Sequence, residues 1–107
     1  MAVTYRTSER EAAATLTELR ALGVEAAAVR LDLVDPDGPA RALGEFEERL
    51  GTLDVLVNNA SFFEPTPFPT EDHAGWYRTF DVLVHGPYRL RPFSRASIPG
   101  ATALASR

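Results

Sequence analysis

A short apolar segment that runs directly into polar residues constrains the fold of this chain more than any other feature. Leu53-Asp54-Val55-Leu56-Val57 is followed at once by Asn58-Asn59-Ala60-Ser61. Asn is depleted in strands, so two in succession mark either a turn or the rim of a binding site. In open α/β sheets, ligands bind outside the carboxyl ends of the parallel strands. The segment therefore predicts a buried strand over residues 55–58 that ends in a ligand-binding rim or in a simple turn.

The pattern before this segment predicts alternating strands and helices. Residues 2–5 and 25–30 read as strands, and residues 9–22 and about 39–50 read as helices. The predicted inward positions are Ala12, Leu16, Leu19 and Leu22 in the first helix, and Leu43, Phe46 and Leu50 in the second. The order β-α-β-α-β, with connections of this length, predicts parallel strands with right-handed crossovers.

Boundary signals accompany the first two predicted helices. Ser8 and Glu11 have the spacing of a capping box at the start of the first helix. Gly23 and Gly51 stand where each helix is predicted to end. These signals support two separate helices.

A third helix is predicted after Pro69, with Thr70 as its cap. Its inward residues are predicted to be Trp76, Phe80, Val84 and Tyr88. Pro92 falls inside this helix, where it costs about 3 kcal/mol if the helix stays straight. We therefore expect one domain over residues 1–92 and a weakly ordered tail over residues 93–107.

Composition narrows the classes of function. The 107 residues, 45% of them hydrophobic, allow one core of modest size, and a net charge of −4 argues against nucleic acid or an anionic membrane as a partner. With no cysteine and only His73 and His85, neither disulfides nor a metal cluster is expected. No stretch approaches the roughly 18 apolar residues of a membrane span, and residues 1–6 do not resemble a signal peptide. We expect a cytoplasmic protein.

The string from Asn58 to Ser61 resembles the short-chain dehydrogenase/reductase family, whose fourth strand ends in Asn-Asn-Ala-Gly; Ser61 replaces the glycine. The longer string from Asn58 to Pro67 is similar to the pteridine reductases of that family. The resemblance covers roughly residues 2–90. It implies part of a doubly wound Rossmann fold in three layers, with about three parallel strands and flanking helices, and an NADP-dependent reduction of a carbonyl or a pterin C=N bond.

The resemblance also assigns contacts at the ends of the first two strands. Arg6 stands where NADP-preferring members place a basic residue for the ribose 2′-phosphate, and Thr7 and Ser8 would add hydroxyl donors. Asp32 and Leu33 match the residues that contact adenine in the family. The alternatives from the residues themselves are a solvated Arg6, a helix cap at Ser8 and a loop cap at Asp32.

Further contacts are implied around the segment after the third strand. By the same resemblance, Asn58, Ala60 and Ser61 would line the ribose and nicotinamide side of the cofactor. Phe63 matches the aromatic residue that pteridine reductases stack on the pterin. Burial of Phe62 or Phe63 in the core is the competing interpretation, since aromatic residues dominate cores.

Two family motifs are absent from residues 1–107. No Gly-rich turn follows a strand, and no Tyr-x-x-x-Lys occurs because the sequence has no lysine. In the run from Val82 to Tyr88, Leu83 occupies the position of the family's catalytic Asn. The sequence therefore predicts no catalytic residue and a partial reductase, inactive alone. The alternative is a non-catalytic α/β interaction module, or half of a split reductase, that binds a homo-oligomer or complementing chain through a strand edge or the helix around Trp76.

The missing first strand of the family lies between the strand of residues 3–5 and the strand of residues 55–57. Unpaired buried backbone groups are costly, so its absence has to be compensated. Either these two strands close up and pair, or their free edges recruit another chain. We expect closure into a three-stranded parallel sheet.

Overall fold

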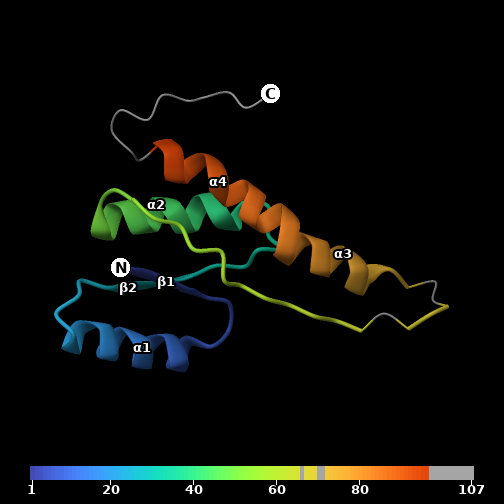
Figure 1. Cartoon of the computed structure of the whole chain (residues 1–107), viewed down its shortest axis with the longest axis horizontal. Coiled ribbons are helices and arrows are strands. Elements are labelled where there is room, and N and C mark those ends of the chain that lie inside the picture. Colours follow the sequence, from blue (N-terminus) through green and yellow to red (C-terminus); the bar gives the residue numbers. More distant parts are fainter. Residues whose placement is uncertain (66, 70–71, 97–107) are drawn as a thin grey trace.

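The computed structural model describes residues 1–65, 67–69 and 72–96, and the side chains of these residues as far as residue 91. The elements in chain order are β1 (Ala2–Tyr5), α1 (Glu9–Ala21), β2 (Ala27–Arg30), α2 (Gly38–Leu50), α3 (Ala74–Phe80), the π-helical segment η1 (Asp81–His85) and α4 (Gly86–Ala96). Figure 1 shows α1 on one face of the two strands, and α2 and α4 on the other. The predicted α/β class and its three layers are confirmed.

The sheet contains two parallel strands in the described part of the chain, not three. β1 pairs with β2 in a register from Ala2 opposite Ala27 to Tyr5 opposite Arg30. The predicted strand over residues 55–58 is wrong, because this segment has no backbone pairing with a described residue. The predicted closure onto β1 is wrong for the same reason.

The segment after α2 is held by side chains rather than by a sheet. Leu53 and Leu56 are half-buried against the core, whereas Val55 and Val57 are 74% and 76% exposed. A strand needs a neighbouring backbone to satisfy its N–H and C=O groups, and strand-forming side chains cannot replace it. The segment therefore stays extended and open.

Helix α1 begins and ends by different means. The side chain of Ser8 makes no cap hydrogen bond, so the predicted capping box is wrong; its ψ of 60° lies outside the extended region of a usual N-cap residue. At the other end, Gly23 has a φ of +79°, and its N–H donates to the Arg20 carbonyl at 3.0 Å. The Val24 N–H donates to the Leu19 carbonyl at 3.1 Å, which completes a Schellman motif. Gly23 ends α1 as predicted.

The inward face of α1 is shorter than predicted. Ala12 is buried, and Leu16 and Leu19 are half-buried. Leu22 is exposed because it follows the last helical residue, where the chain turns away at Gly23. The prediction for Leu22 is therefore wrong.

The core lies between the sheet and α2, with one contribution from α4. Its buried members are Val29, Leu31, Leu33, Ala42, Leu43, Phe46 and Leu90. Leu43 and Phe46 are inward as predicted, Leu50 is half-buried, and Gly51 ends α2 with a φ of +79°. Gly86 brings α4 close to this core, since a Cβ at that position would stand 2.7 Å from the Leu33 Cβ.

The C-terminal helical region differs most from its prediction. It begins at Ala74 with His73 as N-cap, and the predicted cap Thr70 lies outside the described residues. The four side chains predicted to be inward, Trp76, Phe80, Val84 and Tyr88, are instead between 39% and 63% exposed. Figure 1 shows α3 extending away from the sheet and α2, which accounts for the exposure of Trp76 and Phe80; Val84 lies on η1 and Tyr88 on α4.

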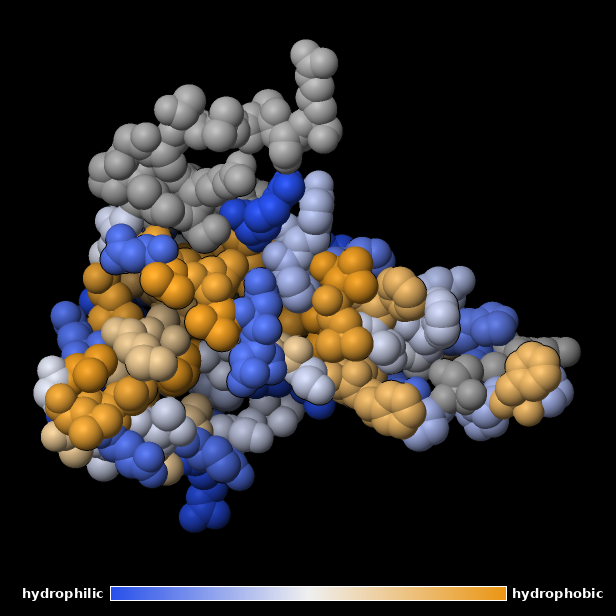
Figure 2. All heavy atoms as spheres, viewed as in Figure 1, coloured by the Kyte–Doolittle hydropathy of each residue, from blue (hydrophilic) through white to orange (hydrophobic). Residues whose placement is uncertain are grey.

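Helix α4 continues through Pro92 to Ala96, so the proline does not end the helix. Residues 93–96 belong to the segment predicted as a weakly ordered tail, and residues 97–107 lie outside the described part of the chain. Figure 2 shows that apolar side chains are also spread over the visible face of the molecule. Among the described helices, none is long and apolar enough to span a membrane.

Candidate functional site

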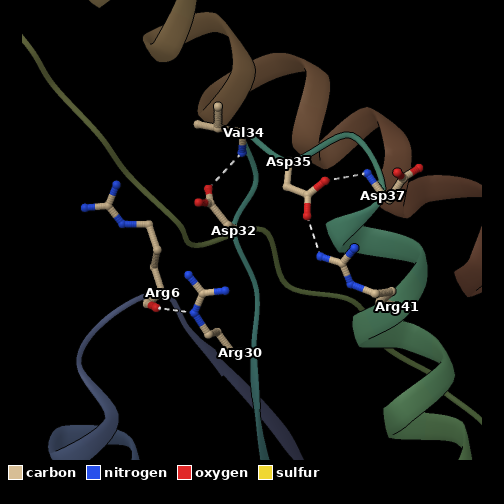
Figure 3. Close-up of polar contacts among 7 residues, drawn as sticks. All are labelled: Arg6, Arg30, Asp32, Val34, Asp35, Asp37 and Arg41. Carbon is tan, nitrogen blue, oxygen red and sulfur yellow. Dashed lines mark hydrogen bonds and ion pairs between the residues drawn. The ribbon is translucent and has the colours of Figure 1, made fainter.

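The carboxyl ends of β1 and β2 bring Arg6 and Asp32 to one edge of the sheet. Because Tyr5 stands opposite Arg30, the residues that follow the two strands emerge side by side. The Leu31 N–H donates to the Tyr5 carbonyl at 2.8 Å, and the Arg30 Nε donates to the Arg6 carbonyl at 3.1 Å. Figure 3 shows Arg6, Arg30 and Asp32 gathered at these strand ends. We call this edge the strand rim.

Sequence reasoning did not assign Arg30 to the site. It ends the predicted second strand, and its position beside Arg6 depends on the register of β1 and β2. Its side chain fixes the Arg6 carbonyl and adds a second guanidinium to the strand rim. The only signal in the sequence was the pair of strand-terminal arginines, Arg6 and Arg30.

Asp32 acts as a loop cap. Its Oδ1 accepts a hydrogen bond from the Val34 N–H at 3.0 Å, which is the local turn that Asp side chains favour. Its other carboxylate oxygen has no hydrogen-bond partner among the described residues, so the loop-cap role leaves an acceptor at the rim. Leu33 points into the core and is buried against Gly86, so its side chain offers little surface to a ligand.

An open groove adjoins the strand rim beside β1. It has a volume of about 540 Å³, and Arg6, Thr7 and Ser8 form part of its wall. The remaining lining residues come from β1 and α1; they are Val3, Thr4, Tyr5, Glu11, Ala12 and Thr15. The groove therefore joins the three residues predicted to contact a 2′-phosphate.

The residues predicted to follow a third strand are exposed. Asn58, Ala60 and Ser61 lie on the extended segment, and no hydrogen bond connects them to Arg6 or Asp32 in the part of the chain that the structure describes. Phe63 is 83% exposed, so its predicted alternative of core burial is wrong, whereas Phe62 is half-buried. The structure thus brings together the residues that follow β1 and β2, but not the residues predicted to follow a third strand.

A bidentate ion pair ties this extended segment to α3. Arg78 donates from Nε and Nη2 to the two carboxylate oxygens of Glu64 at 2.9 and 2.6 Å. The hydrogen bonds from Arg78 lower the pKa of Glu64, and Glu64 in turn raises the pKa of Arg78. A Cβ on Gly75 would lie 3.0 Å from the Glu64 Cδ, so the contact is close. Sequence reasoning missed this pair, whose members are 14 positions apart.

A second acidic residue is held ionised near the start of α2. The Asp37 N–H donates to Asp35 at 3.0 Å, and Arg41 also forms an ion pair with Asp35 (Figure 3). The backbone N–H of Asp37, followed by Arg41, lowers the pKa of the Asp35 carboxyl. This carboxylate is therefore occupied by protein partners, unlike the free oxygen of Asp32.

The helical region after residue 73 shows no catalytic arrangement among its described side chains. Leu83 lies on η1 and is exposed, and leucine cannot donate or accept a hydrogen bond. His85 and Asp81 pair with each other through Nδ1 and Oδ1 at 2.9 Å. In the described residues, no three His, Asp or Glu side chains lie close enough together to hold a metal ion.

Comparison with known proteins gives consistent matches. The family model for short chain dehydrogenase matches residues 1–93. Over 86 residues the chain is 37% identical to the uncharacterized oxidoreductase YohF of Escherichia coli, covering 80% of this chain and 34% of that protein. It is 33% identical over 80 residues to a sorbitol dehydrogenase of Cereibacter sphaeroides, covering 74% and 31%. The chain therefore spans about a third of the length of these curated relatives.

Two solved structures show the same arrangement of elements. A blue fluorescent protein from a metagenomic library, in complex with NADPH, matches with a TM-score of 0.82 and 32% identity. A short chain dehydrogenase from Burkholderia cenocepacia, in complex with NADP, matches with a TM-score of 0.84 and 29% identity. Each match covers 91% of this chain and 40% of the other.

Proposed function

Since this chain belongs to the short-chain dehydrogenase family, we propose that its strand rim forms the adenosine-binding part of an NADP-dependent oxidoreductase. The observation that carries this proposal is the meeting of Arg6 and Asp32 at one edge of the sheet (Figure 3). Two related structures contain NADPH or NADP, which supports the choice of cofactor. The residues after β1 are Arg6, Thr7 and Ser8, and none of them is acidic. Directly after β1, a negatively charged 2′-phosphate therefore meets one cation and two hydroxyls, and Glu11 is the acidic residue among the groove's lining residues.

Each rim residue has a distinct role in this proposal. The Arg6 guanidinium pairs with the 2′-phosphate, and the hydroxyls of Thr7 and Ser8 donate hydrogen bonds to it. The free oxygen of Asp32 accepts a hydrogen bond from the adenine amine. Arg30 holds the Arg6 carbonyl and so orients the backbone that carries Arg6.

The chemistry of such a cofactor is transfer of a hydride from the reduced nicotinamide to the substrate. In our proposal, Asn58, Ala60 and Ser61 line its ribose and nicotinamide side. Residues 1–107 contain no Tyr-x-x-x-Lys and have Leu83 at the Asn position, so they supply no proton donor. We expect this chain alone to bind nucleotide without turnover, within a lineage that reduces a carbonyl or a pterin C=N bond.

For the pterin version of the substrate, the supporting residue is Phe63. Its ring is 83% exposed, so it is accessible for stacking on a flat heteroaromatic ligand. We expect Phe63→Ala to weaken binding of a pterin, measured by its fluorescence, by about fivefold, as loss of about 1 kcal/mol of stacking requires. Binding of an adenosine phosphate should not change. Equal effects on both ligands would count against the pterin assignment.

A nucleotide titration tests the cofactor assignment. We expect NADPH to bind more tightly than NADH and to raise the melting temperature, when nucleotide fluorescence and thermal unfolding are followed in parallel. Arg6→Gln should remove this preference, because it removes the charge that distinguishes the two nucleotides. Arg10→Gln on α1 is the matched control and should keep it. A folded chain that binds neither nucleotide would refute the proposal.

The alternative, a non-catalytic interaction module, has its own supporting observation. Trp76 and Phe80 form an exposed aromatic face on α3, with their rings 4.9 Å apart, and Tyr77 and Tyr88 are also exposed on the C-terminal helices. Exposed aromatic clusters are typical of protein interfaces. Under this alternative, analytical ultracentrifugation finds a homo-oligomer that Trp76→Ala dissociates. A monomer at all accessible concentrations would contradict a homo-oligomer formed through this face.

A further inference from the structure

The fold uses only part of the hydrogen-bonding capacity of Arg30. Its Nε donates to the Arg6 carbonyl at 3.1 Å, and its side chain stands in an exposed position at the end of β2. A guanidinium carries N–H donors on every nitrogen, in a planar fork that matches the oxygens of a phosphate. The Nη donors of Arg30 contact no residue that the structure describes. These donors are therefore available to a ligand at the strand rim.

Arg6 and Arg30 are also two neighbouring cations without an acidic partner. Because the Arg30 Nε contacts the Arg6 main chain, the two side chains start from adjacent strand ends. Other arginines on the surface, Arg41, Arg49 and Arg78, each pair with a carboxylate. Within the described part of the chain, neither Arg6 nor Arg30 has such a pair. Two like charges close together repel each other, so an anion that contacts both is favoured.

The surroundings of the two arginines suit a phosphate. Figure 3 shows both side chains extending past the strand ends, with the Arg30 guanidinium between Arg6 and Asp32. On the other side of Arg6, Thr7 and Ser8 line the groove beside β1. A phosphate that is held by Arg6 thus has hydroxyl donors on one side and Arg30 on the other. Asp32 is the acidic residue of the strand rim, and it forms no ion pair with either arginine.

We propose that Arg30 binds the 2′-phosphate directly and is a second residue that determines specificity for a 2′-phosphorylated nucleotide. This inference rests on the proposed function and deepens it, because it adds a direct contact to the support that Arg30 gives the Arg6 carbonyl. The Arg30 Nη groups donate to phosphate oxygens that Arg6 leaves free, and they reach the phosphate only while Arg6 holds it. A phosphate monoester carries a charge of about −1.5 to −2 at neutral pH, which two guanidinium groups match.

Two substitutions separate the direct contact from the support of the Arg6 carbonyl. In Arg30→Gln, the amide nitrogen takes the place of Nε along the side chain, so it can still donate to that carbonyl. The charge and the Nη donors are lost. In Arg30→Met, the donor to the Arg6 carbonyl is lost as well. Because Arg30 is exposed, we expect both variants to keep the melting temperature of the unchanged chain.

Isothermal calorimetry on the whole chain, with 2′,5′-ADP and 5′-AMP as the probes, measures the difference. We expect Arg30→Gln to weaken binding of 2′,5′-ADP about fivefold, as for one charge-assisted contact at an exposed site, and to leave 5′-AMP unchanged. Arg30→Lys keeps the charge without the planar fork and should recover part of the loss. Arg10→Gln on α1 removes a cation away from the strand rim and is the matched control, which should bind both ligands as before.

Each contrary result overturns the inference in a different way. If Arg30→Gln binds 2′,5′-ADP as tightly as the unchanged chain, Arg30 makes no contact with the phosphate; a loss confined to Arg30→Met would show that it acts through the Arg6 carbonyl alone. Equal losses for both ligands would place Arg30 against the adenosine instead. In these cases the proposed function stands, provided that Arg6→Gln still removes the preference. If the unchanged chain shows no preference for 2′,5′-ADP, the proposed function and the inference fail together.

Discussion

Residues 1–51 and the extended segment of residues 53–65 have similar strand-forming side chains but opposite outcomes. In the first region, β1 and β2 pair, and Val29 and Phe46 are buried between the layers. In the second, Val55 and Val57 follow the same apolar pattern and remain about three-quarters exposed. The difference is the presence of a neighbouring backbone. The α1 crossover places β2 beside β1, whereas no described backbone pairs with the extended segment. A strand is thus a property of a pair of segments rather than of one sequence.

The largest change in the free energy of unfolding is expected from a substitution at Phe46, in the packed region. Phe46→Ala leaves a cavity in the core and should lower the free energy of unfolding by about 3–5 kcal/mol, enough to remove cooperative unfolding from a small domain. Val57→Ala on the open segment should change it by less than about 0.5 kcal/mol. Urea denaturation followed by circular dichroism measures both. Equal losses would show that the segment is as tightly packed as the core.

A smaller effect is expected where α4 meets the core. In Gly86→Ala, the new methyl group would stand 2.7 Å from the Leu33 Cβ, and we expect a loss of about 1–3 kcal/mol from overpacking. Gly44→Ala is the matched control on α2, where a Cβ meets open space. It should stabilise the chain by up to about 1 kcal/mol through helix propensity. A lower melting temperature for Gly86→Ala and a higher one for Gly44→Ala would confirm the close approach. An unchanged melting temperature for Gly86→Ala would contradict it.

The smallest effect is expected from the ion pair that anchors the open segment. The folded-state pKa of Glu64 is lowered, so its contribution to stability is present above the ordinary pKa of about 4.3 and is lost as the pH falls through its folded value. Glu64→Gln should therefore flatten part of the acid limb of a stability-against-pH curve. Glu18→Gln on α1 should leave that limb unchanged. Because Asp35 also has a lowered pKa, the comparison between variants carries the test.

Local signals explain which parts of the fold were predictable from the sequence. Helices α1 and α2, their ends at Gly23 and Gly51, and the inward positions of Leu43 and Phe46 follow from periodicity and turn chemistry within a few residues. The absence of a strand over residues 55–58 was not predictable, because strand formation depends on a partner far away in the chain. The prediction of an inward face on the C-terminal helix was wrong for a similar reason. Periodicity defines an apolar face but does not show whether another layer covers it.

The residues of the candidate site likewise separate into those that could be predicted from the sequence and those that depend on contacts between distant segments. Arg6 and Asp32 were assigned by resemblance to the residues that follow the corresponding strands of the family, and parallel pairing brings them together. Arg30 was missed because its place beside Arg6 depends on the strand register. The Glu64–Arg78 pair was missed because nothing in a local pattern connects residues on a loop and a distant helix.

The most direct test of the account is titration of the folded chain with 2′,5′-ADP and, in parallel, with 5′-AMP by isothermal calorimetry at low salt. These ligands differ by the one phosphate group that we assign to Arg6, and neither requires the nicotinamide side of the site. The account predicts saturable binding of 2′,5′-ADP that is at least about 10-fold tighter and that Arg6→Gln reduces to the level of 5′-AMP, consistent with loss of a charge-assisted contact. Equal affinities for the two ligands, or a preference that survives Arg6→Gln, would contradict the assignment of the strand rim.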